Sequence, residues 1–201
     1  MKKYLAELVG TFGLTLAVVL SVHSNAQFAL PTPLIASLTL MLFVYAIGHI
    51  SGSHINPAVT IGQWSVGKIK TIDAAFYIVA QFIGAMAAAG LVTIIIPAFA
   101  VATAQPEQPF ALGAEAMGMF LFAFGIAAVV EKRVSTGASG FVVGGSLLLG
   151  LAVSSLSGAS GILNPAVAFG LKSFSTAYII GPLVGAVAGM ITYRLIDGMK
   201  K

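Results

Sequence analysis

The sequence predicts an all-α membrane protein, built from six transmembrane helices and two re-entrant half-helices that form an inverted repeat. Three observations lead to this fold class. The composition suits lipid better than water, six apolar stretches are long enough to cross a bilayer, and an Asn-Pro-Ala tripeptide occurs twice at the spacing of an internal repeat.

The composition excludes several classes of protein. Of the 201 residues, 58% are hydrophobic and only 8% are charged, whereas soluble domains carry roughly 25% charged residues. The net charge of +4 is spread between apolar runs, so no basic groove for nucleic acid is expected. The chain has no cysteine, which excludes disulfides and Cys-based metal sites. No nucleophile–base pair, phosphate loop or metal cluster indicates an enzyme, and no cofactor is expected.

Six segments meet the length of about 20 mostly apolar residues that a transmembrane helix needs. Two shorter apolar segments would reach about 15 Å as helices, which is half of the membrane, so we expect them to be re-entrant. The six expected spans are Tyr4–Val22, Leu34–Ile50, Asp73–Ala98, Phe110–Val130, Ala138–Ser157 and Thr176–Asp197, and the two half-spans are Pro57–Val66 and Pro165–Ser173.

The basic residues predict the orientation in the membrane. With six spans, one side of the bilayer receives both termini and the second and fourth loops, and it carries Lys2, Lys3, Lys68, Lys70, Lys132, Arg133, Arg194, Lys200 and Lys201. The opposite side carries Lys172 alone. Because cytoplasmic loops are rich in Lys and Arg, we expect a multi-pass protein of the cell membrane with both termini in the cytoplasm.

The chain also resembles itself. Ala6, Glu7, Gly10 and Phe12 recur as Ala114, Glu115, Gly118 and Phe120, which lie 108 residues further on. The two Asn-Pro-Ala motifs, at 56–58 and 164–166, have the same separation. Each half therefore holds three spans and a half-span, and an odd number of spans inverts the second copy. We expect one domain, 1–201, with repeats of about 1–105 and about 110–201.

Small residues repeat every fourth position in two of the spans. Such stripes let membrane helices approach closely, and we interpret them as packing surfaces only. They are Ala80, Gly84 and Ala88 in one span, and Gly181, Gly185 and Gly189 in the other.

The Asn-Pro-Ala motif is typical of a helix start. Asn is a favoured N-cap, and Pro suits the first helical position because its missing N–H is not needed there. Two such starts at the midplane would point two positive dipole ends, each about half a charge, at one place. Asn56 and Asn164 could then donate hydrogen bonds to a passing solute, while the field opposes cations and protons.

On these motifs the chain resembles the aquaporin, or major intrinsic protein, family over essentially its whole length. Gly48–Gly52, the Ala-Val-Thr that begins with Ala58, and the two Ala-Glu pairs match it as well. The resemblance implies an aquaporin-like right-handed bundle, a homotetramer with one pore per subunit, and a passive channel for water and small uncharged solutes. It also implies that Glu7 and Glu115 hold the backbone of the re-entrant loops.

The resemblance fails at the expected selectivity filter. Family members usually carry an Arg three positions after the second Asn, and here that position is Val167. Counting without gaps, the other three filter positions match Ala36, Ala152 and Gly161. Small side chains at all four positions predict a wide filter without fixed charge, which would admit glycerol, urea, ammonia or metalloid hydroxides. Two alternatives stay open, namely a structural or weakly conducting protein of the same fold and a leaky ion-conducting relative.

Overall fold

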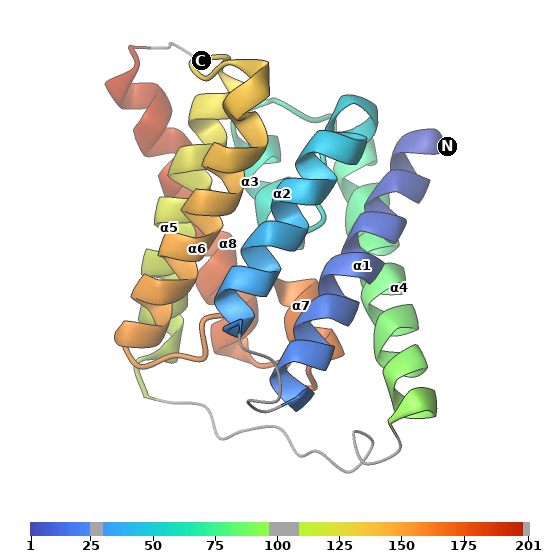
Figure 1. Cartoon of the computed structure of the whole chain (residues 1–201). Coiled ribbons are helices and arrows are strands. Elements are labelled where there is room, and N and C mark those ends of the chain that lie inside the picture. The colour runs from blue at the N-terminus through green and yellow to red at the C-terminus, as the bar shows by residue number, and fades with distance from the viewer. Residues whose placement is uncertain (25–29, 97–108, 199–201) are drawn as a thin grey trace.

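The computed structural model describes residues 1–24, 30–96 and 109–198 (Figure 1). Within these ranges it consists of helices and turns, and six helices are long and apolar enough to cross a membrane. These six are α1 (Lys2–Ser24), α2 (Thr32–Ser51), α4 (Thr71–Ile95), α5 (Ala111–Val130), α6 (Ser139–Leu156) and α8 (Thr176–Ile196), and the short helices are α3 (Pro57–Ser65), η2 (Thr136–Ala138) and α7 (Pro165–Gly170).

The six spans and two half-spans are therefore confirmed, with small changes at their ends. The third span stops at Ile95, and Ala98 lies outside the described residues. The second half-helix ends at Gly170, three residues earlier than we expected. Its chain turns away at Lys172, which has a φ of 57°, while the Ser173 N–H returns to the Ala168 carbonyl. This left-handed exit is a common way for a helix to end.

The arrangement of the helices follows the inverted repeat. In Figure 1, α3 lies in the half of the bundle that contains the N-terminus and the end of α8, and α7 lies in the opposite half. Within the first repeat α1 packs mainly on α4, and within the second repeat α5 packs mainly on α8. The two half-helices thus enter from opposite ends of the bundle, as the sequence predicted.

Glycines permit the closest helix contacts, at equivalent places in the two repeats. A Cβ added at Gly84 of α4 would overlap the carbonyl oxygen of Leu8 in α1, and one added at Gly185 of α8 would overlap that of Ala116 in α5. The other two glycines of the α8 stripe likewise face α5 carbonyls. The small-residue stripes are therefore packing surfaces.

These contacts show that the repeat spacing is not constant. Leu8 and Ala116 are 108 residues apart, but their partners Gly84 and Gly185 are only 101 apart. Ser51 and Ser154, which bond equivalent glutamates, are 103 apart. The second repeat therefore has five more residues between its serine and its Asn-Pro-Ala motif, and seven fewer between the motif and the matching glycine of its last helix.

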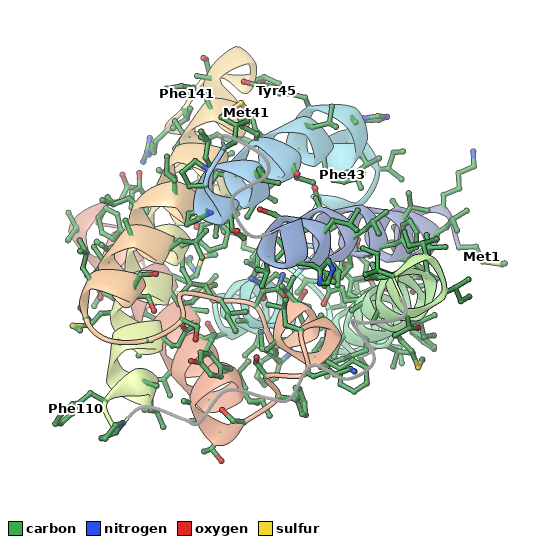
Figure 2. The ribbon with its side chains drawn as sticks, turned by 60° about the horizontal axis from the view of Figure 1, so that its bottom comes forward. Met1, Met41, Phe43, Tyr45, Phe110 and Phe141 are labelled. Atoms are coloured by element: carbon green, nitrogen blue, oxygen red, sulfur yellow. The ribbon has the colours of Figure 1, made fainter. Side chains whose placement is uncertain are left out.

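Apolar side chains cover much of the outer surface, as a bilayer requires. Figure 2 shows Met41, Tyr45 and Phe141 together at one end, where α2 meets α6. The Tyr45 hydroxyl donates to the Gly137 carbonyl at 2.8 Å and accepts from the Phe141 N–H at 3.3 Å, so it joins the start of α6 to α2.

Ion pairs gather at the end of the bundle that carries the N-terminus. Glu131, at the end of α5, lies between Lys68 at 2.7 Å and Arg194 at 3.3 Å. The charged ends of the helices are therefore tied to one another rather than buried in the apolar zone. The other described pairs are Lys3 with Asp73 and Arg133 with Asp197.

Candidate functional site

The two half-helices begin at the asparagines, in the way that the sequence predicts. Asn56 Oδ1 accepts the N–H of Ala58 at 2.8 Å. Asn164 Oδ1 accepts the N–H groups of Ala166 at 3.1 Å and Val167 at 3.4 Å. A proline occupies the first turn of each helix. Each side-chain oxygen therefore satisfies helix N–H groups that would otherwise have no partner.

The amide nitrogens of the same asparagines connect the two repeats. Asn56 Nδ2 donates to the Leu163 carbonyl at 2.9 Å, and Asn164 Nδ2 donates to the Ile55 carbonyl at 3.0 Å. Ile55 and Leu163 have φ values of 39° and 55°, in the left-handed region that costs a non-glycine residue about 1–3 kcal/mol. This conformation turns each carbonyl toward the opposite motif, so each loop fixes the other.

One N–H of each asparagine takes part in no hydrogen bond with the described residues. An amide group carries two N–H donors, and the opposite carbonyl takes one of them. Asn56 and Asn164 both line the same cavity. The positive ends of α3 and α7 also meet here. The arrangement therefore provides hydrogen-bond donors and a positive field without a charged side chain.

Two buried glutamates hold the loops that precede the motifs. Glu7 accepts the N–H groups of His54 and Ile55 at 2.9 and 2.6 Å, and Glu115 accepts those of Ile162 and Leu163 at 3.0 and 2.7 Å. Both side chains are fully buried. These carboxylates supply the acceptors that irregular backbone needs at membrane depth.

The first loop has additional polar side chains around its glutamate. Gln81 Nε2 donates to Glu7 at 2.8 Å and to Thr60 Oγ1 at 2.9 Å. His54 Nδ1 lies 3.1 Å from the same Thr60 hydroxyl, and its ring meets that of Tyr77 edge to face at 5.1 Å. His54 is nearly fully buried and also lines the cavity.

The cavity has a volume of about 610 Å³ and extends from the ends of α1 and α2 to the two asparagines. Most of its wall is apolar, and no Asp, Glu, Lys or Arg of the described residues contributes to it. The wall consists of Leu14, Val18, Val22, His23, Thr32, Pro33, Ala36, Leu40, His54, Ile55, Asn56, Phe122, Leu147, Leu151, Ser160, Gly161, Ile162, Asn164, Val167, Leu171 and Ser173.

Three of the four expected filter residues lie on this wall. Ala36, Gly161 and Val167 line the cavity, whereas Leu151 lines it in place of Ala152. Leu151 and Ala152 are neighbours on α6, and only Leu151 is among the lining residues. One residue along a helix turns a side chain by about 100°. Leu151 therefore shares its face of α6 with Leu147, four residues earlier.

Gly161 lies at a place where a side chain does not fit. A Cβ there would overlap the Ser155 hydroxyl and would lie 2.8 Å from the Leu151 carbonyl. Its φ of 67° also favours glycine. The loop can therefore pass close to α6 at this point.

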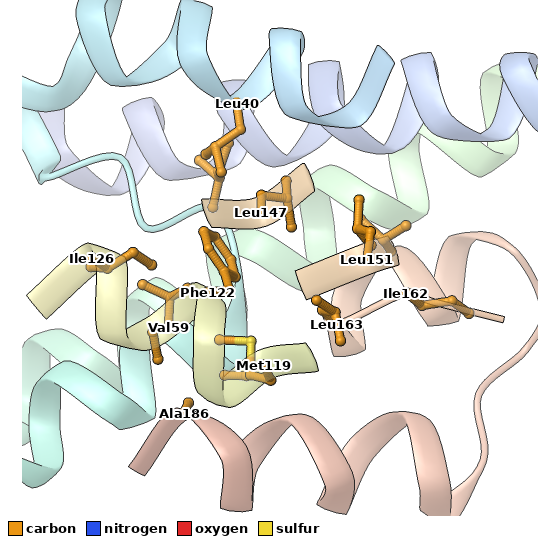
Figure 3. Close-up of a cluster of buried hydrophobic side chains, with 14 of the residues drawn as sticks. Leu40, Val59, Met119, Phe122, Ile126, Leu147, Leu151, Ile162, Leu163 and Ala186 are labelled. Carbon is orange, nitrogen blue, oxygen red and sulfur yellow. The ribbon is translucent and has the colours of Figure 1, made fainter. Parts of the chain in front are cut away.

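Larger apolar residues that sequence reasoning missed lie deeper in the wall. Figure 3 shows Leu40 of α2 and Leu147 of α6 pointing toward Phe122 of α5, and Leu151 lies one turn beyond Leu147. Leu40 lies four residues after Ala36 on α2, and Leu151 lies four residues after Leu147 on α6. For Phe122, the sequence did not show which side of α5 faces the cavity. A four-residue spacing from Ala36 could have identified Leu40.

Comparison with known proteins agrees with this geometry. A family model described as Major intrinsic protein matches residues 1–193. Aquaporin NIP1-1 of Zea mays is 32% identical over 98% of this chain and 75% of its own length. Aquaporin AqpM of Methanothermobacter thermautotrophicus is 35% identical over 76% of this chain and 71% of its own. The X-ray structure of the aquaglyceroporin from Plasmodium falciparum has the same fold, with a TM-score of 0.76 over 97% of this chain and 94% of that chain at 20% identity.

The fold and these relatives define a multi-pass membrane channel for water and small solutes, which works passively and is not an enzyme. The chain belongs to the major intrinsic protein family.

Proposed function

We propose that the channel passes water together with larger neutral solutes such as glycerol, urea, ammonia or metalloid hydroxides. The observation that carries this proposal is the apolar cavity wall, in which Val167 occupies the position of the family's usual Arg. The carbon skeleton of such a solute can contact this wall while the amide groups of Asn56 and Asn164 donate hydrogen bonds to its oxygen atoms. The filter that we propose consists of Ala36, Leu151, Gly161 and Val167.

Ions face two barriers in this proposal. An unpaired charge that leaves water for an apolar site costs several kcal/mol or more, and the ends of α3 and α7 present a positive field to cations. Without the Arg, this field is the only fixed positive charge that we assign to the pore. We therefore expect a low cation leak, below the currents of a dedicated ion channel.

The test compares the wild type with Val167→Arg in proteoliposomes. Stopped-flow swelling should show water, glycerol and urea entry for the wild type. In the variant the barrier to the larger solutes should rise by at least about 1 kcal/mol, which slows their entry about fivefold, with a smaller change for water. A wild type that passes water but excludes both glycerol and urea would contradict the proposal. Equal cation currents for both proteins in planar bilayers would show that Val167 does not determine the leak.

We also propose a homotetramer in the cell membrane, with a pore in each subunit and both termini in the cytoplasm. The basic residues at one end of the bundle support the orientation, and the family supports the assembly. The chain has no cysteine, so single cysteines introduced at Lys2 and Lys172 would report the two sides. If an impermeant reagent labelled the cysteine at position 2 in intact cells, the N-terminus would lie outside the cell and the proposed orientation would be wrong. Native mass spectrometry would test the tetramer.

A further inference from the structure

The loop before the second motif contains a serine that faces the cavity. Asn164 lies ten positions after Ser154, whereas in the first repeat Asn56 lies only five positions after Ser51. Ser160 lies in the longer part, is exposed, and belongs to the cavity wall. The additional length therefore adds a polar group to a cavity wall that is mostly apolar.

The hydrogen bonds around Ser160 fix the direction of its hydroxyl group. The Ser160 backbone N–H donates to the Tyr178 hydroxyl oxygen at 3.2 Å. The Tyr178 hydroxyl donates its single proton to Ser160 Oγ at 2.8 Å. Because Ser160 Oγ accepts this bond, its own proton remains to be donated. The tyrosine thus orients the serine as a donor on the cavity wall.

The first repeat has no such group at the equivalent place. Tyr77, the counterpart of Tyr178, donates its hydroxyl proton at 2.8 Å to the backbone carbonyl of Ser51. The Ser51 hydroxyl is itself committed to Glu7 at 2.7 Å. The donor at Ser160 is therefore a property of the longer loop and not of the repeat.

We propose that Ser160 is a specificity-determining residue, whose hydroxyl donates a hydrogen bond to the permeating solute before the solute reaches the asparagines. This inference rests on the proposed passage of solutes larger than water. The matching chemical class is a neutral molecule with an acceptor oxygen, such as an alcohol hydroxyl or an amide carbonyl. Such a solute keeps one hydrogen bond while its remaining surface leaves water for the apolar wall.

Ser160→Ala removes the donor, and Ser160→Thr keeps it. In proteoliposomes, the ratio of glycerol or urea permeability to water permeability should fall about fivefold in the alanine variant, the change that corresponds to one neutral hydrogen bond of about 1 kcal/mol. The threonine variant should restore the ratio to within about twofold. Ser157→Ala is the matched control, because Ser157 belongs to the same loop but not to the cavity wall.

The outcomes separate this inference from the proposed function. A wild type that passes glycerol or urea, with an unchanged ratio in Ser160→Ala, would overturn the role of Ser160 and leave the proposed function intact. An equal loss of water and solute permeability would assign Ser160 a purely structural role and would also overturn the inference. A wild type that passes water alone would overturn both.

Discussion

Replacing Glu7 with glutamine tests how the first motif is held in place. The carboxylate accepts four hydrogen bonds. Its Oε1 serves the Ser51 hydroxyl and the His54 N–H, and its Oε2 serves the Ile55 N–H and the Gln81 amide. Glutamine offers only one oxygen. If that oxygen replaces Oε1, the new NH2 group faces two donors, and the N–H of the fully buried Ile55 loses its acceptor.

The cost can be worked out from the number of donors left without a partner. A buried donor without an acceptor costs about 1–3 kcal/mol. Among the described residues, Gln81 Oε1 is buried without a hydrogen-bond partner, so a turned Gln81 amide could present this oxygen to the new NH2 group. The turn would also move the Gln81 NH2 group away from Thr60 Oγ1. With or without the turn, at least two donors are therefore unsatisfied, and the variant loses about 2–6 kcal/mol of stability.

The assay measures the fraction of channel that stays monodisperse in detergent after heating, together with water permeability in proteoliposomes. Both should fall, because Ile55 is the residue whose carbonyl holds Asn164. Ser146→Ala serves as a control, since the Ser146 hydroxyl bonds only to the Val142 carbonyl of its own helix, and its effect should stay within about 0.5 kcal/mol. If Glu7→Gln also stayed within this limit, the glutamate would not be holding the loop.

Two further predictions concern packing and pore access. Gly84→Ala should destabilise the channel by about 1–3 kcal/mol because its Cβ would overlap the Leu8 carbonyl, whereas Gly90→Ala in the same helix, with nothing within 4 Å of its Cβ, should be neutral or slightly stabilising by thermal denaturation. Thiol reagents should leave the wild-type permeability unchanged because the chain has no cysteine, while Val167→Cys should become sensitive to them. Resistance of the Cys variant would place Val167 away from the conducting path, and inhibition of the wild type would show that the reagent acts on groups other than thiols.

The sequence was sufficient for the helices and insufficient for the filter, and the reason is physical. Apolar length and the Asn-Pro helix start are local signals, so the spans and half-helices could be predicted. The wall residue on α6 depends on the number of residues that the second loop uses between Ser154 and Asn164, and on a helical rotation of about 100° per residue. The path of that loop and the rotation of α6 depend on contacts of Ser154 with Glu115 and of Ser160 with Tyr178, which are distant in sequence. Leu151 could therefore not be distinguished from Ala152.

The bonds between the two motifs could not be predicted for a different reason. They require Ile55 in a left-handed conformation, which is unfavourable for a β-branched residue. Local preference argues against the observed geometry. It persists because Glu7 takes the Ile55 N–H and Asn164 takes its carbonyl, so that contacts from both repeats outweigh the local cost.

The two repeats hold their loops by different chemistry, and this difference bears on which loop can interact with solute. In the first repeat Gln81 and Thr60 join the network around Glu7. Their counterparts, by the contacts that relate the repeats, are Pro182 and Ala168, which have no side-chain hydrogen-bonding groups. In the second loop Tyr178 donates a hydrogen bond to the Ser160 hydroxyl. The serine oxygen accepts this bond, and the serine proton is not used by it. The contact with Tyr178 uses the Ser160 hydroxyl only as an acceptor, and this is what leaves a donor on the cavity wall.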